Sequence, residues 1–219
     1  MTPAFPTLRW VAIAWLAVYV PAYASAYGWA NFVFLCNLGV FVLAAGLWSG
    51  SPLLISSQAI GMLVVDVVWT ADLLSRLVTE THWIGGTEYM WDPRWPLFTR
   101  LLSLYHAATP LLVVHGLRRV GYDPRAYWLQ SALAVAGVLV GRLLGPEANV
   151  NGAFRDPMFQ RAWGPPVVHL AAVAGTLVLA VYPLTNLALS RIFGRAGARP
   201  QTTPRGPASG SPARRRRST

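Results

Sequence analysis

The chain is poor in charge and in cysteine. Its 219 residues include no lysine, one cysteine and eight acidic residues, and charged residues make up 12 % of the total. A soluble domain usually carries about 25 % charged residues. The single cysteine, Cys36, excludes an intrachain disulfide. The absence of lysine is typical of a GC-rich genome and indicates a bacterial source, and the composition as a whole excludes an ordinary soluble domain.

Long apolar runs fill most of the chain instead. Hydrophobic residues make up 54 % of it, and the mean hydropathy is +0.43. About 20 apolar residues in a helix span the hydrocarbon core of a bilayer. The sequence therefore predicts an all-α bundle of six transmembrane helices over residues 1–193, in a bacterial inner membrane. The expected helices cover residues 10–27, 31–48, 53–74, 97–117, 126–144 and 166–189.

The first run has a second interpretation. Arg9 followed by an apolar stretch, with Ala24-Ser25-Ala26 as a cleavage site, also fits a signal peptide over residues 1–26. We favour a retained helix, because the apolar character continues through Trp29.

Arginine placement predicts the orientation. The net charge is +10, and much of it lies after the last apolar run, including four consecutive arginines from Arg214 to Arg217. Loops rich in arginine stay in the cytoplasm, so both ends are expected inside. Residues 194–219 are rich in Pro, Gly, Ser and Arg and are predicted to be disordered. We expect this tail to bind anionic lipid headgroups and not nucleic acid.

Polar residues inside the predicted helices are the best pointers to a site, because a charged group at the bilayer centre costs at least about 2.5 kcal/mol. Cys36 with Asn37, Asp66 and His106 fall at similar depth in the outer half of the bilayer. One hypothesis is catalytic: Cys36 as nucleophile, His106 as general base and Asp66 orienting the imidazole, for acyl transfer from a lipid. The alternative is structural: Cys36 is a small buried residue, and Asp66 and His106 hydrogen-bond between helices.

Further patterns add to the candidate set. Arg100 and Ser103 share a helix stripe with His106, so they are expected to face the bundle and to bind the same ligand. A metal site on His106, His169 and Asp66 lacks any ligand-spaced motif, and no metal or cofactor is expected.

The loops also contain candidates. Asn149, Asn151 and Arg155 could line the mouth of a cavity that receives a headgroup, or Asn could simply form turns. Tyr89 and Trp91 suit an interfacial aromatic belt. Asp72 and Arg76 are expected to form an i, i+4 ion pair near the membrane surface, and lipids are the expected partners.

Three stretches resemble, in the same order, motifs of the YwaF-like family of bacterial polytopic membrane proteins, which is distantly grouped with a vertebrate intramembrane ether-lipid acyltransferase. They are Phe34-Leu35-Cys36-Asn37, Ser103-Leu104-Tyr105-His106, and Asn149-Val150-Asn151 through Trp163-Gly164-Pro165-Pro166. The resemblance implies a compact bundle with a lipid-facing cleft and acyl-transfer chemistry at Cys36 and His106. The family has a His-x-Cys pattern, and here Phe34 replaces that histidine.

Two functions therefore remain open at the level of sequence. The first is a non-catalytic protein that handles lipids or small solutes or assists assembly. The second is an intramembrane lipid acyltransferase or hydrolase that uses a Cys–His pair.

Overall fold

The computed structural model describes residues 3–156 and 158–194, and every regular element in that part is helical. The all-α prediction is confirmed. The predicted tail lies outside the described residues except for Gly194. The helices are α1 (Leu8–Tyr27), α2 (Leu35–Ser49), α3 (Pro52–Thr79), α4 (Leu97–Leu102), α5 (Tyr105–Val120), α6 (Ala126–Leu143), α7 (Pro166–Gly175) and α8 (Tyr182–Phe193). Short 3₁₀ turns cover Trp29–Val33, Glu88–Trp91 and Val150–Gly152, and a π-helical segment covers Thr176–Val181.

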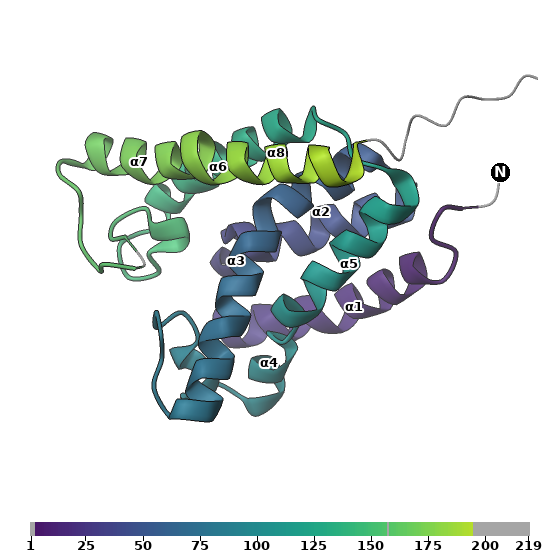
Figure 1. Cartoon of the computed structure of the whole chain (residues 1–219). Coiled ribbons are helices and arrows are strands. Elements are labelled where there is room, and N and C mark those ends of the chain that lie inside the picture. The colour runs from purple at the N-terminus through teal and green to yellow at the C-terminus, as the bar shows by residue number, and fades with distance from the viewer. Residues whose placement is uncertain (1–2, 157, 195–219) are drawn as a thin grey trace, which may run out of the picture.

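Five helical stretches of the described chain are long and apolar enough to cross a membrane: α1, α3, α4 with α5, α6, and α7 with α8. The remaining apolar helix, α2, has 15 residues and follows the 3₁₀ turn at Trp29–Val33. The start of α1 and the end of α8 lie at the same end of the bundle (Figure 1). We call this the terminal end, and the opposite end the loop end.

Two predicted helices are interrupted. The run at 97–117 breaks between α4 and α5, where the amides of Ser103, Leu104 and His106 bond three residues back instead of four. Such 3₁₀ geometry narrows and redirects a helix. The run at 166–189 passes through the π-helical segment just before Pro183, which has no amide hydrogen to continue the α-helical ladder.

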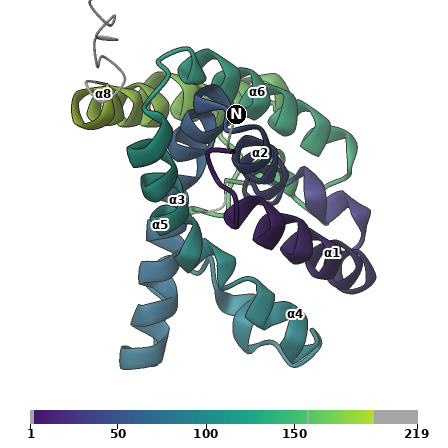
Figure 2. The ribbon, with the colours of Figure 1, turned by 90° about the vertical axis from the view of Figure 1, so that its right-hand side faces the viewer.

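Helix α3 lies in the middle of the bundle and contacts α2, α5, α6 and α8 (Figures 1 and 2). Ile55 of α3 is fully buried, and a Cβ on Gly116 of α5 would lie 2.9 Å from its side chain, so α3 and α5 approach closely. Towards the loop end, α3 and α4 diverge (Figure 2). Residues 80–96, here called the α3–α4 loop, connect them there.

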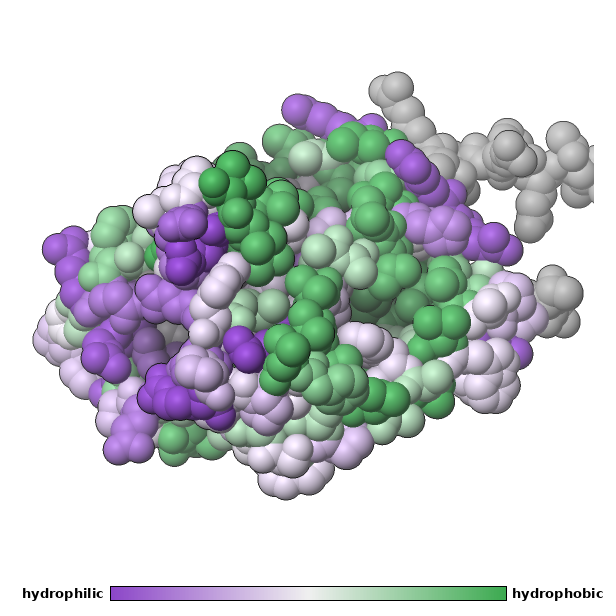
Figure 3. Space-filling view, turned by 90° about the horizontal axis from the view of Figure 1, so that it is seen from below, coloured by the Kyte–Doolittle hydropathy of each residue, from purple (hydrophilic) through white to green (hydrophobic). Residues whose placement is uncertain are grey.

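The surface is apolar across the middle of the molecule. Large side chains such as Leu111, Leu143 and Leu179 are 74 %, 84 % and 77 % exposed. In Figure 3, hydrophobic residues cover the middle, and hydrophilic ones gather at the loop end and near the terminal end. A soluble protein rarely exposes so much contiguous apolar surface, so lipid is the solvent of this band, and the chain is an integral membrane protein.

Candidate functional site

A hydrogen-bonded cluster joins α1, α2 and α5 around Asn37. Its side-chain oxygen accepts hydrogen bonds from the hydroxyls of Tyr19 (2.8 Å) and Tyr105 (2.7 Å). Its amide nitrogen donates to the carbonyl oxygen of Asn31 at 2.7 Å. A buried amide with these partners is well satisfied. Asn37 therefore fixes the position of its neighbour Cys36, whose Sγ lies 3.9 Å from the same oxygen.

The break between α4 and α5 positions His106. Its Nδ1 lies 2.8 Å from the carbonyl oxygen of Ser103. Because a carbonyl oxygen only accepts hydrogen bonds, Nδ1 carries a proton. The Ser103 hydroxyl is also bonded, at 2.5 Å, to the hydroxyl of Tyr23. The imidazole stacks on Trp69 of α3 (ring centroids 4.6 Å apart) and on Tyr105 (4.0 Å). These contacts fix the orientation of the ring.

Asp66 lies beside this imidazole. Its Oδ1 is 4.0 Å from Nε2 of His106, and its side chain is fully buried. Within the described residues, neither carboxylate oxygen has a hydrogen-bond partner. Buried polar atoms are rarely left unbonded, and each such exception calls for an explanation.

Next to this cluster lies a cavity of about 360 Å³, which we call the aromatic cavity. Half of the residues that line it are aromatic: Tyr23, Tyr27, Phe34, Trp69, Tyr89 and Trp95. The others are Asn31, Cys36, Asn37, Gly86, Ser103 and His106. The structure therefore brings Cys36, Asn37, Ser103 and His106 together, with Asp66 behind His106.

Three of the lining residues, Gly86, Tyr89 and Trp95, come from the α3–α4 loop. Asp72 holds this loop in place. The Asp72 carboxylate is 1 % exposed and accepts hydrogen bonds from the amides of Ile84 (2.7 Å), Gly85 (3.2 Å) and Thr87 (3.1 Å). It also bonds the hydroxyl of Thr87 at 2.6 Å and contacts Nδ1 of His82 at 3.3 Å.

The predicted Asp72–Arg76 pair is therefore wrong. Arg76 donates instead to the carbonyl oxygen of Glu80, and its guanidinium lies 5.6 Å from the ring of Trp91. Four donors within one loop surround the carboxylate more completely than one arginine on the helix surface would.

Tyr89 lies at the cavity wall that the loop forms. Burial raises the pKa of its hydroxyl. Tyr89 therefore stays protonated at neutral pH and presents a neutral ring and hydroxyl to the cavity.

The remaining candidates lie outside the lining. Arg100 donates to the carbonyl oxygen of Met90 at 2.7 Å and so ties α4 to the α3–α4 loop. Asn149 adopts a left-handed conformation (φ 40°) and accepts hydrogen bonds from the amides of Phe154 and Arg155. Asn149 thus acts as a turn residue, and Arg155 is exposed.

Asn151 has a role that its sequence context did not indicate. Its side-chain oxygen accepts from the amide of Leu35 at 2.8 Å, at the start of α2. Its amide nitrogen donates to the carbonyl oxygens of Val33 and Gly137, both at 2.9 Å. It therefore caps α2 from a loop more than 100 residues away and sets where Cys36 and Asn37 lie.

His169 is likewise structural in the described chain. Its Nε2 lies 2.9 Å from the carbonyl oxygen of Gly152, and its Nδ1 accepts from the amide of Trp163 at 3.3 Å. It therefore holds the loop before α7. Within residues 3–156 and 158–194, no group of three His, Cys, Asp or Glu side chains is placed to hold a metal ion.

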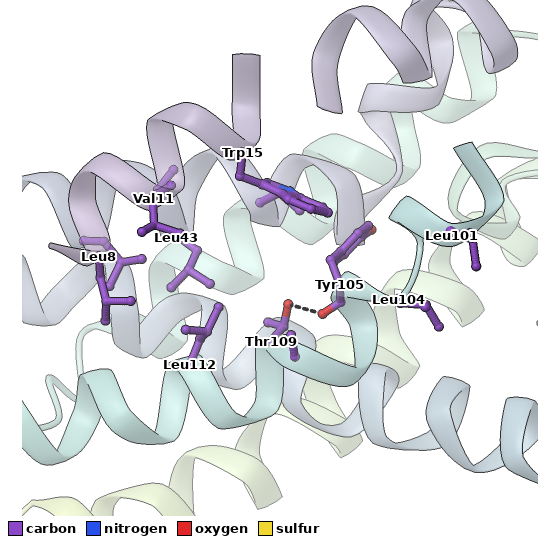
Figure 4. Close-up of a pocket in the computed structure, with 14 residues that line it drawn as sticks. Leu8, Val11, Trp15, Leu43, Leu101, Leu104, Tyr105, Thr109 and Leu112 are labelled. Carbon is purple, nitrogen blue, oxygen red and sulfur yellow. Dashed lines mark hydrogen bonds between the residues drawn. The ribbon is translucent and has the colours of Figure 1, made fainter. Parts of the chain in front are cut away.

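A second hollow, the apolar groove, lies between α1, α2 and α5 (Figure 4). Its volume is about 400 Å³, and Leu8, Val11 and Trp15 of α1 face Leu112 of α5 across it (Figure 4). The hydroxyl of Thr109 is satisfied by the carbonyl oxygen of Tyr105 at 2.9 Å, so the wall is apolar. Tyr105 separates the groove from the polar cluster, because its hydroxyl bonds Asn37.

The bonding of His106 bears on the catalytic hypothesis. In a nucleophile–base–acid arrangement, one imidazole nitrogen serves the nucleophile and the other the orienting acid. Here Nδ1 is bonded to Ser103, and Nε2 is the nitrogen next to Asp66. No hydrogen bond joins Cys36 to His106 in the described part of the chain. The described residues therefore do not form the thiol–imidazole contact that the catalytic hypothesis requires.

Comparison of the chain with known protein families, with curated proteins and with solved structures gave no match. The resemblance to the YwaF-like family stays a prediction.

Proposed function

We propose that this chain is a non-catalytic protein of a bacterial inner membrane that binds a small solute or a lipid headgroup in the aromatic cavity. One observation carries the proposal: a cavity of about 360 Å³ at the loop end is lined by six aromatic side chains and a few convergent polar groups. Ligand sites are typically concave and mostly apolar, with a small number of placed polar groups.

The surroundings of the cavity support this function. The Asp72 carboxylate holds the α3–α4 loop in one conformation, so the wall formed by Gly86, Tyr89 and Trp95 is preorganised. The apolar groove lies on the other side of Tyr105, within the apolar helices. Val11, Leu101 and Leu104 at its edge are 55 %, 49 % and 41 % exposed, so an acyl chain can enter it from the bilayer.

The test uses Gly86, which lines the cavity. A Cβ at this position would meet no atom within 4 Å, so a side chain can be added there without a backbone clash. Native mass spectrometry of the protein purified in mild detergent should show a bound solute or lipid on the wild type and on Gly86→Ala. Gly86→Trp should lack it, because the indole fills the cavity. Equal occupancy of all three proteins, or an empty wild type, would refute the proposal.

The second candidate is intramembrane acyl transfer or hydrolysis, which the shared lining of the cavity by Cys36 and His106 favours. It is tested by incubation with phospholipid acyl donors, followed by intact mass measurement. A hydroxylamine-sensitive adduct that is absent in Cys36→Ala and diminished in His106→Ala would establish it. If no protein, wild type included, forms an adduct across a broad panel of donors, acyl transfer and hydrolysis through Cys36 are excluded.

A further inference from the structure

We propose that the ligand of the aromatic cavity is an organic ammonium ion, either a free amine cation or the ammonium of a lipid headgroup, with Asp66 as its buried counter-charge. This inference rests on the proposed function and names the ligand class of the same site. Its two foundations are the ring faces of the lining and the charge balance around Asp66.

The lining has the composition of a site for cations. Tyr27 comes from the end of α1, Trp69 from α3, and Tyr89 and Trp95 from the α3–α4 loop. The ring of Tyr27 lies 4.7 Å from that of Trp95 and 6.4 Å from that of Tyr89, so these rings form one continuous wall. The negative face of an aromatic ring attracts a cation, and the attraction grows when water is excluded. Clusters of aromatic rings are used in this way to recognise quaternary ammonium groups.

The charge balance points in the same direction. None of the residues that line the cavity carries a positive charge at pH 8, and Asp66 lies directly behind His106 with both oxygens unbonded. A buried carboxylate without a partner is unfavourable, and a cation nearby relieves that cost. The arginine of α4, Arg100, does not line the cavity and is bonded to the carbonyl oxygen of Met90.

Protons compete with the cation at this site. Because Nδ1 of His106 already donates to Ser103, a further proton on the Asp66–His106 pair resides on Nε2 or on the carboxyl group, and it neutralises the pair. Binding should therefore weaken as pH falls. The other titratable or charged groups around the pair and the cavity are Tyr19, Tyr23 and Tyr27 of α1, Cys36 of α2, Tyr89 of the loop, Arg100 of α4 and Tyr105 of α5. Phenol and thiol groups ordinarily lose their protons only above pH 8, so the Asp66–His106 pair is the group whose charge is expected to change as pH falls.

The experiment measures binding to the full chain in lipid nanodiscs at pH 8 by calorimetry. The probes are choline and its uncharged isostere, 3,3-dimethyl-1-butanol, for the free-solute source. Lysophosphatidylcholine and lysophosphatidylglycerol serve for the headgroup source. We expect choline or lysophosphatidylcholine to bind at least tenfold more tightly than its partner without the ammonium. Binding of choline would identify a free amine cation as the ligand, and binding of lysophosphatidylcholine alone would identify a lipid headgroup.

Three variants locate the site. Asp66→Asn keeps the shape of the side chain, and it should weaken binding at least tenfold and abolish the dependence on pH. Tyr27→Leu removes one ring and should weaken binding about tenfold. Asp92→Ala is the control: Asp92 lies in the α3–α4 loop outside the lining and pairs with the exposed Arg94, so this variant should bind within twofold of the wild type.

The outcomes separate the two proposals. Equal affinity for the ammonium and the uncharged probe, or no binding of either ammonium probe, overturns the cation class. An unchanged affinity in Asp66→Asn overturns the role of the carboxylate. If these tests fail while Gly86→Trp still displaces a ligand from the purified protein, the proposed function stands and the ligand is neutral or anionic.

Discussion

Replacing Asp72 with alanine should detach the α3–α4 loop and open the aromatic cavity. The carboxylate is 1 % exposed and receives hydrogen bonds from three backbone amides and one hydroxyl. A hydrogen bond to a charged group contributes about 1.5–3 kcal/mol, and these bonds act as one unit, so they do not add. Removal of one partner of a buried charged network typically costs about 3–5 kcal/mol. We expect Asp72→Ala to lower the free energy of unfolding by about that amount.

The assay is a chemical unfolding titration in mixed detergent micelles, followed by tryptophan fluorescence. Cys36 supplies a second readout, because it lines the cavity and should react faster with a maleimide once the loop is released. Asp92→Ala is the matched control, since Asp92 lies in the same loop but pairs with Arg94, which is 81 % exposed. That variant should match the wild type in both assays. If Asp72→Ala has the same free energy of unfolding and the same maleimide reactivity as the wild type, the reasoning is refuted.

Three further predictions test the rest of the bundle. Asn151→Ala should lower the unfolding free energy by about 1–3 kcal/mol, because it removes the cap of α2 and leaves buried backbone groups unbonded, and an unchanged titration would contradict this. Gly141→Ala should destabilise by about 1–3 kcal/mol, because its Cβ would lie 2.4 Å from the carbonyl oxygen of Val150. Gly175→Ala, whose Cβ meets no atom within 4 Å, should be neutral or slightly stabilising, so a loss equal to that of Gly141→Ala would rule out the packing argument. A membrane-impermeant maleimide added to intact cells should label Cys36, because both ends are predicted in the cytoplasm. Labelling only from inside-out vesicles would reverse the orientation.

The helices were predictable because lipid imposes one requirement on every spanning segment: about 20 apolar residues with their backbone bonds made internally. The turn between α2 and α3 contains the residues that commonly end and begin helices. Gly50 adopts a left-handed conformation (φ 67°), and Ser51 caps α3 by accepting from the amide of Leu54. These are the usual roles of Gly and Ser at helix ends. The breaks at Ser103 and before Pro183 were not predicted, because hydropathy is continuous across both.

Shared depth made a meeting of Asp66 and His106 feasible, but depth alone did not show that the two helix faces converge. A fixed rise per residue places both side chains at one level of the bilayer, and the structure puts them 4.0 Å apart. The partners of Asp72 could not be found in this way. They are mostly backbone amides, which every residue carries, so no residue type marks them, and the i, i+4 pattern pointed to Arg76 instead. Tyr89 was assigned to an interfacial belt for a similar reason, because composition does not distinguish a ring facing lipid from one facing a cavity.

The bonding of the His106 imidazole is central to the choice between a catalytic site and a binding site. Cys36, His106 and Asp66 have the residue types of a nucleophile, a base and an orienting acid, and a sequence reports nothing about which imidazole nitrogen each would meet. The carbonyl oxygen of Ser103 is available to Nδ1 because of the break between α4 and α5. Nε2 lies 4.0 Å from Oδ1 of Asp66 and has no hydrogen bond to Cys36, so the described residues do not form the contact between a thiol and its base. The same arrangement leaves a buried carboxylate unpaired behind a wall of aromatic rings, which is the electrostatic setting of a cation site. The bond from Nδ1 to Ser103 thus places the imidazole beside the carboxylate on which the proposed ammonium site depends.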